Sequence, residues 1–212
     1  MSVSAQFHFD AATYDAVIRA EVVGYDVIQG AVADATLGPG VKRILDLGAG
    51  TGETSRRVLE RHPQSQLVLL DENPDMLAIA TRALPSARIE AVIVGDLRGA
   101  LPTGPFDLVI SCLAIHHLLT PEKGELFHRI SRCLGLGARF VLGDVVIPDD
   151  PREARIPLSP GYDHPSRVSE LLGLLTFAQL VPSVSWRRAD LAVIRAAPSQ
   201  LTGDERTLEV RP

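Results

Sequence analysis

Residues 44–55 read ILDLGAGTGETS, in which an apolar run meets three alternating glycines and then continues into a stretch of helical character. Glycines at a strand-to-helix turn let the backbone approach a bound ligand closely. The spacing is G-x-G-x-G, and Glu53 stands where a dinucleotide fingerprint needs its last small residue. A carboxylate there would repel a pyrophosphate at the helix N-terminus. The stretch therefore predicts a ligand-binding turn and disfavours a nicotinamide dinucleotide.

The segments on both sides of this turn alternate between strand and helix patterns. After a strand at 41–47 we expect, in chain order, helix 52–62, strand 67–71, helix 74–82, strands 88–94 and 106–111, helix 121–134, strand 138–146 and, past an amphipathic helix, two short strands at 184–188 and 191–196. Strands that alternate with helices favour a parallel sheet covered on both faces. The predicted fold is α/β and doubly wound, with a mostly parallel seven-stranded sheet and a C-terminal antiparallel hairpin.

Composition and charge exclude several classes of function. The chain has 21 Lys+Arg and 26 Asp+Glu, a net charge of -5, and no run of basic residues, which argues against nucleic acid and anionic membranes as partners. Cys112 and Cys133 are the two cysteines and lie in apolar segments, so neither a disulfide framework nor a metal site is expected. No apolar stretch reaches the roughly 20 residues of a membrane span. We expect a cytoplasmic protein.

Acidic residues follow the next two strands. Asp71 ends the strand at 67–71, 19 residues after Gly52, and a carboxylate there can accept both hydroxyls of a ribose. Asp96 follows the strand at 88–94 and could accept from an adenine amino group while Leu97 lies against the ring. These positions extend the predicted ligand site along the ends of the strands.

With these motifs in order, residues 10–196 resemble the class I S-adenosylmethionine-dependent methyltransferases of the small, single-domain kind. The resemblance implies a Rossmann-like fold, S-adenosylmethionine (SAM) as cofactor and S-adenosylhomocysteine (SAH) as product. It also implies that the glycine turn wraps the methionine part, Asp71 holds the ribose, Asp96 with Leu97 holds the adenine, and Asp46 lies near the ammonium. A purely structural, half-buried role for Asp46 is the alternative. The cofactor-binding residues implied in this way are Tyr25, Asp46, Gly48, Ala49, Gly50, Asp71, Glu72, Met76, Gly95, Asp96, Leu97 and Ser111.

A narrower likeness lies upstream, in YDAVIRAEVVGYDVI at 14–28. This stretch is similar to the N-terminal helix of carboxy-S-adenosylmethionine synthases, which implies that Tyr25 contacts the cofactor with Ser111 beside it. The arginine that those synthases use to hold the extra carboxylate has no clear counterpart, so methyl transfer stands ahead of carboxymethyl chemistry. A carboxy-SAM synthase-like or other non-methylating enzyme and a non-catalytic SAM-binding protein are the alternatives.

The chain is expected to form one domain over 1–212. Its parts are an N-terminal helical lid at 10–36, continuous or bent at Gly24, a cofactor-binding core at 41–146, a Pro-rich loop at 147–165, a final helix and hairpin at 166–196 and a flexible tail at 197–212.

Two adjacent histidines open the segment after the fourth strand. His116 and His117 are candidate general bases, because an imidazole pKa of about 6.5 suits proton removal near neutrality. The alternative is a structural pair at the start of a helix, since one of two adjacent side chains must point into the fold. His116 is also a candidate substrate contact.

Further candidate substrate contacts come from the Pro-rich loop and from the N-terminal segment. Asp163 and His164 lie on the Pro-rich loop and could anchor an acceptor or supply a base, or could serve turn geometry alone. Tyr14, with Phe7 and Phe9, could form an apolar lid over the acceptor or belong to the core.

The sequence thus predicts a methyltransferase acting on a small-molecule acceptor by in-line transfer. The negative net charge and the lack of a basic module disfavour nucleic acid, and Ser111-Cys112-Leu113-Ala114 stands where enzymes of exocyclic amino groups carry an Asn/Asp-Pro-Pro-aromatic motif. The sequence is compatible with a homodimer, and it leaves open both the acceptor and the atom that is methylated.

Overall fold

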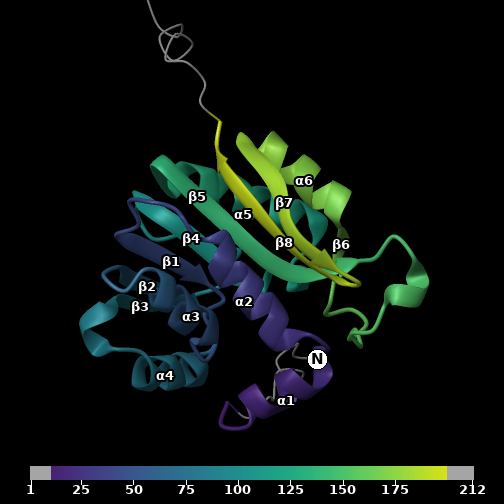
Figure 1. The fold of residues 1–212 in the computed structure, drawn as a ribbon, viewed down its shortest axis with the longest axis horizontal. Coiled ribbons are helices and arrows are strands. Elements are labelled where there is room, and N and C mark those ends of the chain that lie inside the picture. Colours follow the sequence, from purple (N-terminus) through teal and green to yellow (C-terminus); the bar gives the residue numbers. More distant parts are fainter. Residues whose placement is uncertain (1–10, 200–212) are drawn as a thin grey trace, which may run out of the picture.

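The structure is a computed structural model that describes residues 11–199 (Figure 1). Its helices and strands, in chain order, are α1 (Tyr14–Glu21), α2 (Tyr25–Ala35), β1 (Arg43–Leu47), α3 (Glu53–Arg61), β2 (Gln66–Asp71), α4 (Pro74–Ala83), β3 (Ile89–Val94), β4 (Phe106–Cys112), α5 (Thr120–Cys133), β5 (Leu134–Ile147), β6 (Ser166–Arg167), α6 (Val168–Phe177), β7 (Leu180–Arg188) and β8 (Leu191–Pro198).

The strands form a sheet in the order β3-β2-β1-β4-β5-β8-β7. Strands β1 to β5 run parallel to one another, whereas β8 runs antiparallel to both β5 and β7. This confirms the predicted doubly wound fold with a C-terminal hairpin; the two-residue β6, which pairs with β5, was not predicted. The strand order reverses between β1 and β4, and in such sheets ligands bind at this point, beyond the carboxyl ends of the strands.

The two faces of the sheet are covered by different helices. Leu45 and Leu47 point into a core with α5 and α6, whereas Ile44 points into a second core with α2, α3 and α4. Figure 1 shows α2 crossing in front of the sheet and α5 behind it. Alternate β1 side chains are buried on opposite faces, which explains why Ile44, Leu45 and Leu47 are all apolar. Asp46 is the exception on this strand.

The N-terminal segment forms two helices. A break at Val22–Gly24 separates α1 from α2, and Gly24 has a φ of 100°, which a residue with a side chain rarely adopts. Of the two alternatives, the segment bent at Gly24 is confirmed. Residue 10 of the predicted lid, together with Phe7 and Phe9, lies outside the described residues.

Most element bounds match the predictions within two residues, with four differences. Strand β7 begins at Leu180 rather than at 184. Strand β5 begins at Leu134 rather than at 138, because Leu134 already pairs with Phe106 across a register shift. The Pro-rich loop begins after Ile147, which ends β5, and contains a 3₁₀ turn at Pro151–Glu153. Ala197 and Pro198 pair with β7 and so belong to β8 rather than to a tail. The remainder of the predicted tail, 200–212, lies outside the described residues.

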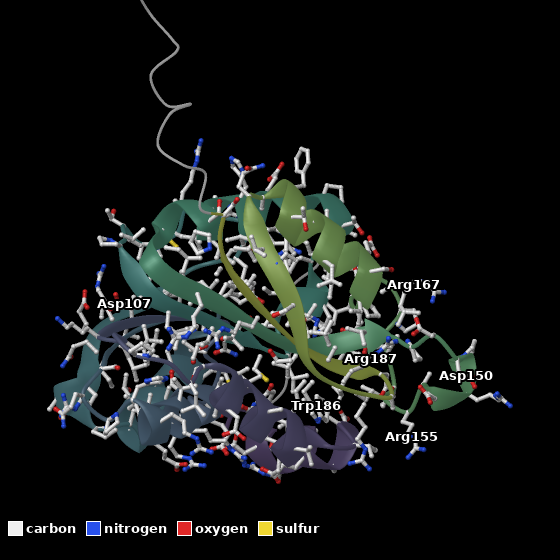
Figure 2. All side chains as sticks on the ribbon, turned by 45° about the horizontal axis from the view of Figure 1, so that its top comes forward. Asp107, Asp150, Arg155, Arg167, Trp186 and Arg187 are labelled. Atoms are coloured by element: carbon white, nitrogen blue, oxygen red, sulfur yellow. The ribbon has the colours of Figure 1, made fainter. Side chains whose placement is uncertain are left out.

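The amino and carboxyl ends of the parallel strands lie on opposite sides of the molecule (Figure 2). Asp107, at the amino end of β4, accepts from the backbone amides of Lys42 and Arg43 at 2.9 Å each. Asp150 and Arg155 lie across the molecule, on the loop that follows β5. The predicted ligand residues follow the carboxyl ends of the strands, on the side of this loop. Among residues 11–199, no helix is both long and apolar enough to pass through a bilayer.

Candidate functional site

The glycine turn after β1 is fixed by backbone contacts. The amides of Gly48 and Ala49 both donate to the Leu70 carbonyl, at 2.8 and 3.1 Å. Gly48 has a φ of 71°, and a Cβ on it would lie 2.4 Å from the Cβ of Ala114. Gly50 has a φ of 51° and would direct a Cβ into open space. Packing therefore requires a glycine at 48, while the turn at 50 leaves room for a ligand.

A pocket of about 290 Å³, partly open to solvent, lies at the switch point between β1 and β4. Five predicted site residues line it: Tyr14, Tyr25, Gly48, Ala49 and Gly50. Six further lining residues were missed: Gln29, Thr51, Glu53, Thr54, Cys112 and Leu113. Gln29 lies one helical turn after Tyr25, and Cys112 and Leu113 directly follow Ser111, so spacing could have indicated them.

The N-terminal helices are attached to this pocket by polar contacts. Thr51 donates to Asp15 of α1 at 2.6 Å, and Thr54 donates to Gln29 of α2 at 2.8 Å. Glu53 accepts from Arg57 at 2.6 Å; burial would raise its pKa, but hydrogen bonds from Arg56 and Arg57 hold it below the usual range. Residues from α1, α2 and α3 thus form one continuous wall.

Asp46 is a buried acid with an unused oxygen. Its side chain accepts from Ser55 at 2.6 Å through Oδ2, whereas Oδ1 has no partner in the described part of the chain. The residue is 1% exposed, and burial raises its pKa from 3.8 to about 7. A buried carboxylate without a partner is costly, so this site favours a cation such as an ammonium group nearby.

Asp71, at the end of β2, connects the glycine turn to the next loop. Its Oδ2 accepts from the Gly50 amide at 2.8 Å and its Oδ1 from the Asn73 amide at 2.9 Å. Burial raises its pKa, and these two amide bonds oppose that rise. Each oxygen keeps a further lone pair, so the carboxylate is held in place and can still accept from two hydroxyl groups.

Acidic groups from β2 and β3 gather at the same end of the sheet. The side chain of Glu72 is exposed overall. Partial burial of its carboxyl group and the charges of Asp96 and Asp71 raise its pKa. Asp96 accepts from the Arg98 amide at 2.7 Å and pairs with its guanidinium at 3.3 Å. The Gly95 amide donates to the Asp71 carbonyl at 2.9 Å. The predicted ribose and adenine residues therefore adjoin one another.

Three other predicted residues are placed by the packing of the core. Met76 is buried in the first turn of α4, and Leu97 packs against the core under α5. Ser111 is fully buried, and its hydroxyl donates to the Leu47 carbonyl at 2.8 Å, so it fixes β4 against β1. The structure does not bring Ser111 to the pocket wall; the two residues that follow it take that place.

The first histidine forms a buried pair with an acid that the sequence did not reveal. His116 donates through Nδ1 to Oδ1 of Asp144 on β5 at 2.5 Å, and both residues are buried. Asp144 is fixed in turn by the amide of Val145 at 2.9 Å. The free nitrogen of His116, Nε2, faces Asp163 with 3.8 Å to Oδ1. A neutral imidazole held in this tautomer can accept a proton at Nε2.

The second histidine, His117, contacts residues of the Pro-rich loop. His117 donates through Nδ1 to Oδ1 of Asp163 at 2.9 Å and stacks on Tyr162 at 4.2 Å between ring centroids. Burial and the neighbouring His116 lower its pKa to about 4. His117 therefore stays neutral at physiological pH and serves as a donor to Asp163.

Backbone contacts fasten this loop to the histidines. The His164 amide donates to the His116 carbonyl at 2.7 Å, and the buried Lys123 ammonium donates to the His164 carbonyl and to Ser166 Oγ. His164 thus helps to hold the loop in place through its backbone amide and carbonyl. Asp163, in contrast, places its carboxylate between both imidazoles.

The same cluster has the composition of a metal site. Ligand atoms of His116, His117 and Asp163 all lie within 4.8 Å of one another. In this structure His117 and Asp163 hydrogen bond directly to each other. The cluster thus combines the residue types of a metal site with a hydrogen-bonded network.

Comparisons with known proteins agree with this geometry. Residues 44–137 match the family described as a methyltransferase domain. A malonyl-[acyl-carrier protein] O-methyltransferase of Laribacter hongkongensis is 33% identical over 81% of this chain and 59% of its own length. A trans-aconitate 2-methyltransferase of Acidovorax sp. is 35% identical over 53% of this chain and 40% of its own length. The chain is a class I S-adenosylmethionine-dependent methyltransferase family member. The chain spans about 40–60% of the length of these curated relatives.

Solved structures show the same fold. The mitomycin 7-O-methyltransferase MmcR superposes with a TM-score of 0.72 at 20% identity, over 91% of this chain and 59% of that one. DhpI in complex with SAH superposes with a TM-score of 0.70 at 20% identity, over 90% and 92% of the two chains. The predicted family, Rossmann-like fold and cofactor are confirmed.

Proposed function

We propose that this methyltransferase transfers the methyl group of SAM to a small-molecule acceptor. The observation that carries the proposal concerns the short loop after β4, which contributes both to the pocket at the glycine turn and to a candidate proton acceptor. Leu113 lines the pocket at the glycine turn, and three residues later His116 presents a nitrogen oriented by Asp144. A donor site and a proton acceptor therefore adjoin at the switch point of the sheet.

The residues present fit the cofactor. When bound, SAM supplies an electrophilic methyl group on a sulfonium. The unpartnered oxygen of Asp46 suits the ammonium, and Asp71 suits the two ribose hydroxyls. Asp96 with Leu97 would hold the adenine. We assign to cofactor binding the predicted set of Tyr25, Asp46, Gly48, Ala49, Gly50, Asp71, Glu72, Met76, Gly95, Asp96 and Leu97, with Ser111 acting by positioning β4.

On the acceptor side, His116 is proposed as the general base. Asp144 holds its Nδ1 hydrogen and so leaves Nε2 free to take a proton. His117 orients Asp163, and Tyr14, Asp163 and His164 would border the acceptor. Because the sulfonium already activates the methyl group, orientation and removal of one proton are the main tasks left to the chain.

A small acceptor in the cytoplasm fits the net charge of -5, which gives no basic field for a polyanion. The two relatives named above are called after malonyl-[acyl-carrier protein] and trans-aconitate, both small acceptor groups. A homodimer is compatible with this proposal and is not required by it.

The test is product analysis. The protein is incubated with methyl-labelled SAM and a panel of small acceptors, and SAH and labelled products are identified by mass spectrometry. SAH formed together with a methylated acceptor supports methyl transfer. A carboxylated cofactor formed with prephenate would instead identify a carboxy-SAM synthase, and tight binding without turnover would identify a cofactor-binding protein.

A further inference from the structure

A carboxylate stands directly in front of the proposed base. Oδ1 of Asp163 lies 3.8 Å from His116 Nε2, and Asp163 is held in place on both sides. Its Oδ1 accepts from His117, and its Oδ2 accepts from the Ser159 amide at 2.6 Å. An acceptor atom that reaches His116 Nε2 therefore also comes close to a fixed negative charge.

The surrounding cations are already engaged. In residues 11–199, Arg98 is paired with Asp96 and donates to Glu122 at 2.8 Å, and Lys123 donates to the carbonyl of His164. Arg19 lies 3.6 Å from Glu53. Figure 2 shows Arg155 and Arg167 pointing outward from the protein. The two cations held against the loop and the adjoining acids, Arg98 and Lys123, therefore already have partners.

The tyrosines near this region report the same negative potential. The pKa of Tyr162 is raised by burial and then by the charges of Glu72 and Asp163. The pKa of Tyr14 is raised by burial and, among its charged neighbours, by Asp71 and Asp15. Acidic neighbours thus add to the effect of burial at both tyrosines.

We propose, on the basis of the function proposed above, that the acceptor is an uncharged or cationic molecule that presents a hydroxyl or amine hydrogen, and that carboxylic acids are rejected. A hydroxyl or ammonium group can donate to Asp163 and His116, whereas a carboxylate would meet a like charge without a compensating cation. This separates the chain from its relatives named for malonyl and trans-aconitate acceptors, which carry carboxylates.

The step balances as follows. A lone pair on the acceptor oxygen or nitrogen forms the new bond to the methyl carbon, while the carbon–sulfur bond breaks and its electrons remain on sulfur. The hydrogen of the acceptor passes as a proton to Nε2 of His116, and Asp144 stabilises the resulting imidazolium. The products are the ether or methylamine, SAH and one proton, which is later released to solvent.

The experiment compares two matched acceptor panels with methyl-labelled SAM. One contains phenols, sugar alcohols and primary amines; the other contains trans-aconitate, malonyl-acyl carrier protein and malonate. Methyl esters are recognised because mild base releases labelled methanol from them, whereas ethers and methylamines survive. We expect ethers or methylamines, with carboxylate turnover at least about tenfold lower.

Ester formation as the dominant reaction would overturn the inference while leaving the proposed methyl transfer intact. SAM binding without transfer to any member of either panel would contradict the proposed function, and the inference with it.

A variant pair tests the role of the charge itself. Asp163→Asn should raise the ratio of carboxylate to hydroxyl turnover roughly tenfold, because it removes the like charge near Nε2. Asp149→Asn is the matched control, since Asp149 lies on the same loop but is exposed and pairs with Arg187 at 2.8 Å. A ratio measured within one variant is independent of the fraction of folded protein. An unchanged ratio in Asp163→Asn would contradict the inference.

Discussion

The two halves of the site are built in different ways. The donor half consists of the backbone turn after β1 and acids near the carboxyl ends of β1 and β2, with Asp46, Gly48 and Gly50 inside a stretch of a few residues. The acceptor half consists of side chains from the turn after β4, from β5 and from the Pro-rich loop, since His116 meets Asp144 28 positions later and Asp163 beyond that. Backbone geometry thus defines the proposed cofactor site, whereas long-range side-chain contacts define the proposed acceptor site.

Disturbing the donor turn gives the largest expected effect. Gly48→Ala combines a positive φ with a collision against Ala114, and we expect a loss of about 3 kcal/mol in the free energy of unfolding, measured by urea denaturation. Gly137→Ala has a φ of 73° with open space, so it should lose only about 1 kcal/mol.

The double variant Gly48→Ala/Ala114→Gly sharpens this test, because it removes the Cβ that causes the collision. We expect it to be more stable than Gly48→Ala alone. Equal instability of the single and double variants would show that contact with Ala114 is not the cause.

Removing the base should affect the acceptor half alone. His116→Asn is expected to lower kcat about 100-fold, because Nε2 can no longer take the proton, and to leave the Kd for SAM within about twofold. Turnover is measured with saturating SAM, and SAM binding by calorimetry. His128→Asn, an exposed histidine on α5, is the control. Full activity in folded His116→Asn protein would place the base elsewhere.

Removing Asp71, the proposed ribose ligand, should weaken SAM binding and leave kcat nearly unchanged. Asp71→Ala is expected to weaken SAM binding at least about tenfold, since hydrogen bonds to a charged group are lost. At saturating SAM, kcat should change little. Asp75→Ala removes an exposed acid nearby and serves as the control. A Kd equal to that of the parent protein would contradict the ribose assignment.

The buried Asp46 predicts a pH dependence of the donor half. Its folded-state pKa of about 7 lies above the usual 3.8, so the protonated form stabilises the folded apoprotein below about pH 4, and this stability is lost as the pH rises through 7. An ammonium group nearby favours the ionised form, so SAM binding should tighten about tenfold between about pH 6 and pH 8 and release a proton below pH 7.

Calorimetry in buffers of different ionisation enthalpy measures that proton release. Asp46→Asn, which cannot titrate, should bind SAM with little dependence on pH over this range. The same pH dependence in Asp46→Asn would assign the titration to another group.

Predicted residues around the glycine turn line one pocket because their signals are local. The glycine turn and Asp71 lie at strand ends whose positions follow from the alternation of strands and helices, whereas Tyr25 was implied by the resemblance of the N-terminal helix. The missed lining residues, such as Gln29 and Thr54, are polar positions on helices whose orientation depends on packing. Ser111 shows the same limit, since its neighbours rather than its own hydroxyl face the pocket.

The sequence by itself therefore determined the doubly wound fold, because hydrophobic periodicity and turn chemistry act over a few residues, and its motifs indicated the family through their resemblance. Only the tertiary structure decided which of the two histidines pairs with Asp144 and which carboxylate, that of Asp163, faces its other nitrogen. Contacts between residues far apart in the chain depend on strand register and loop path, and neither is encoded in a local pattern.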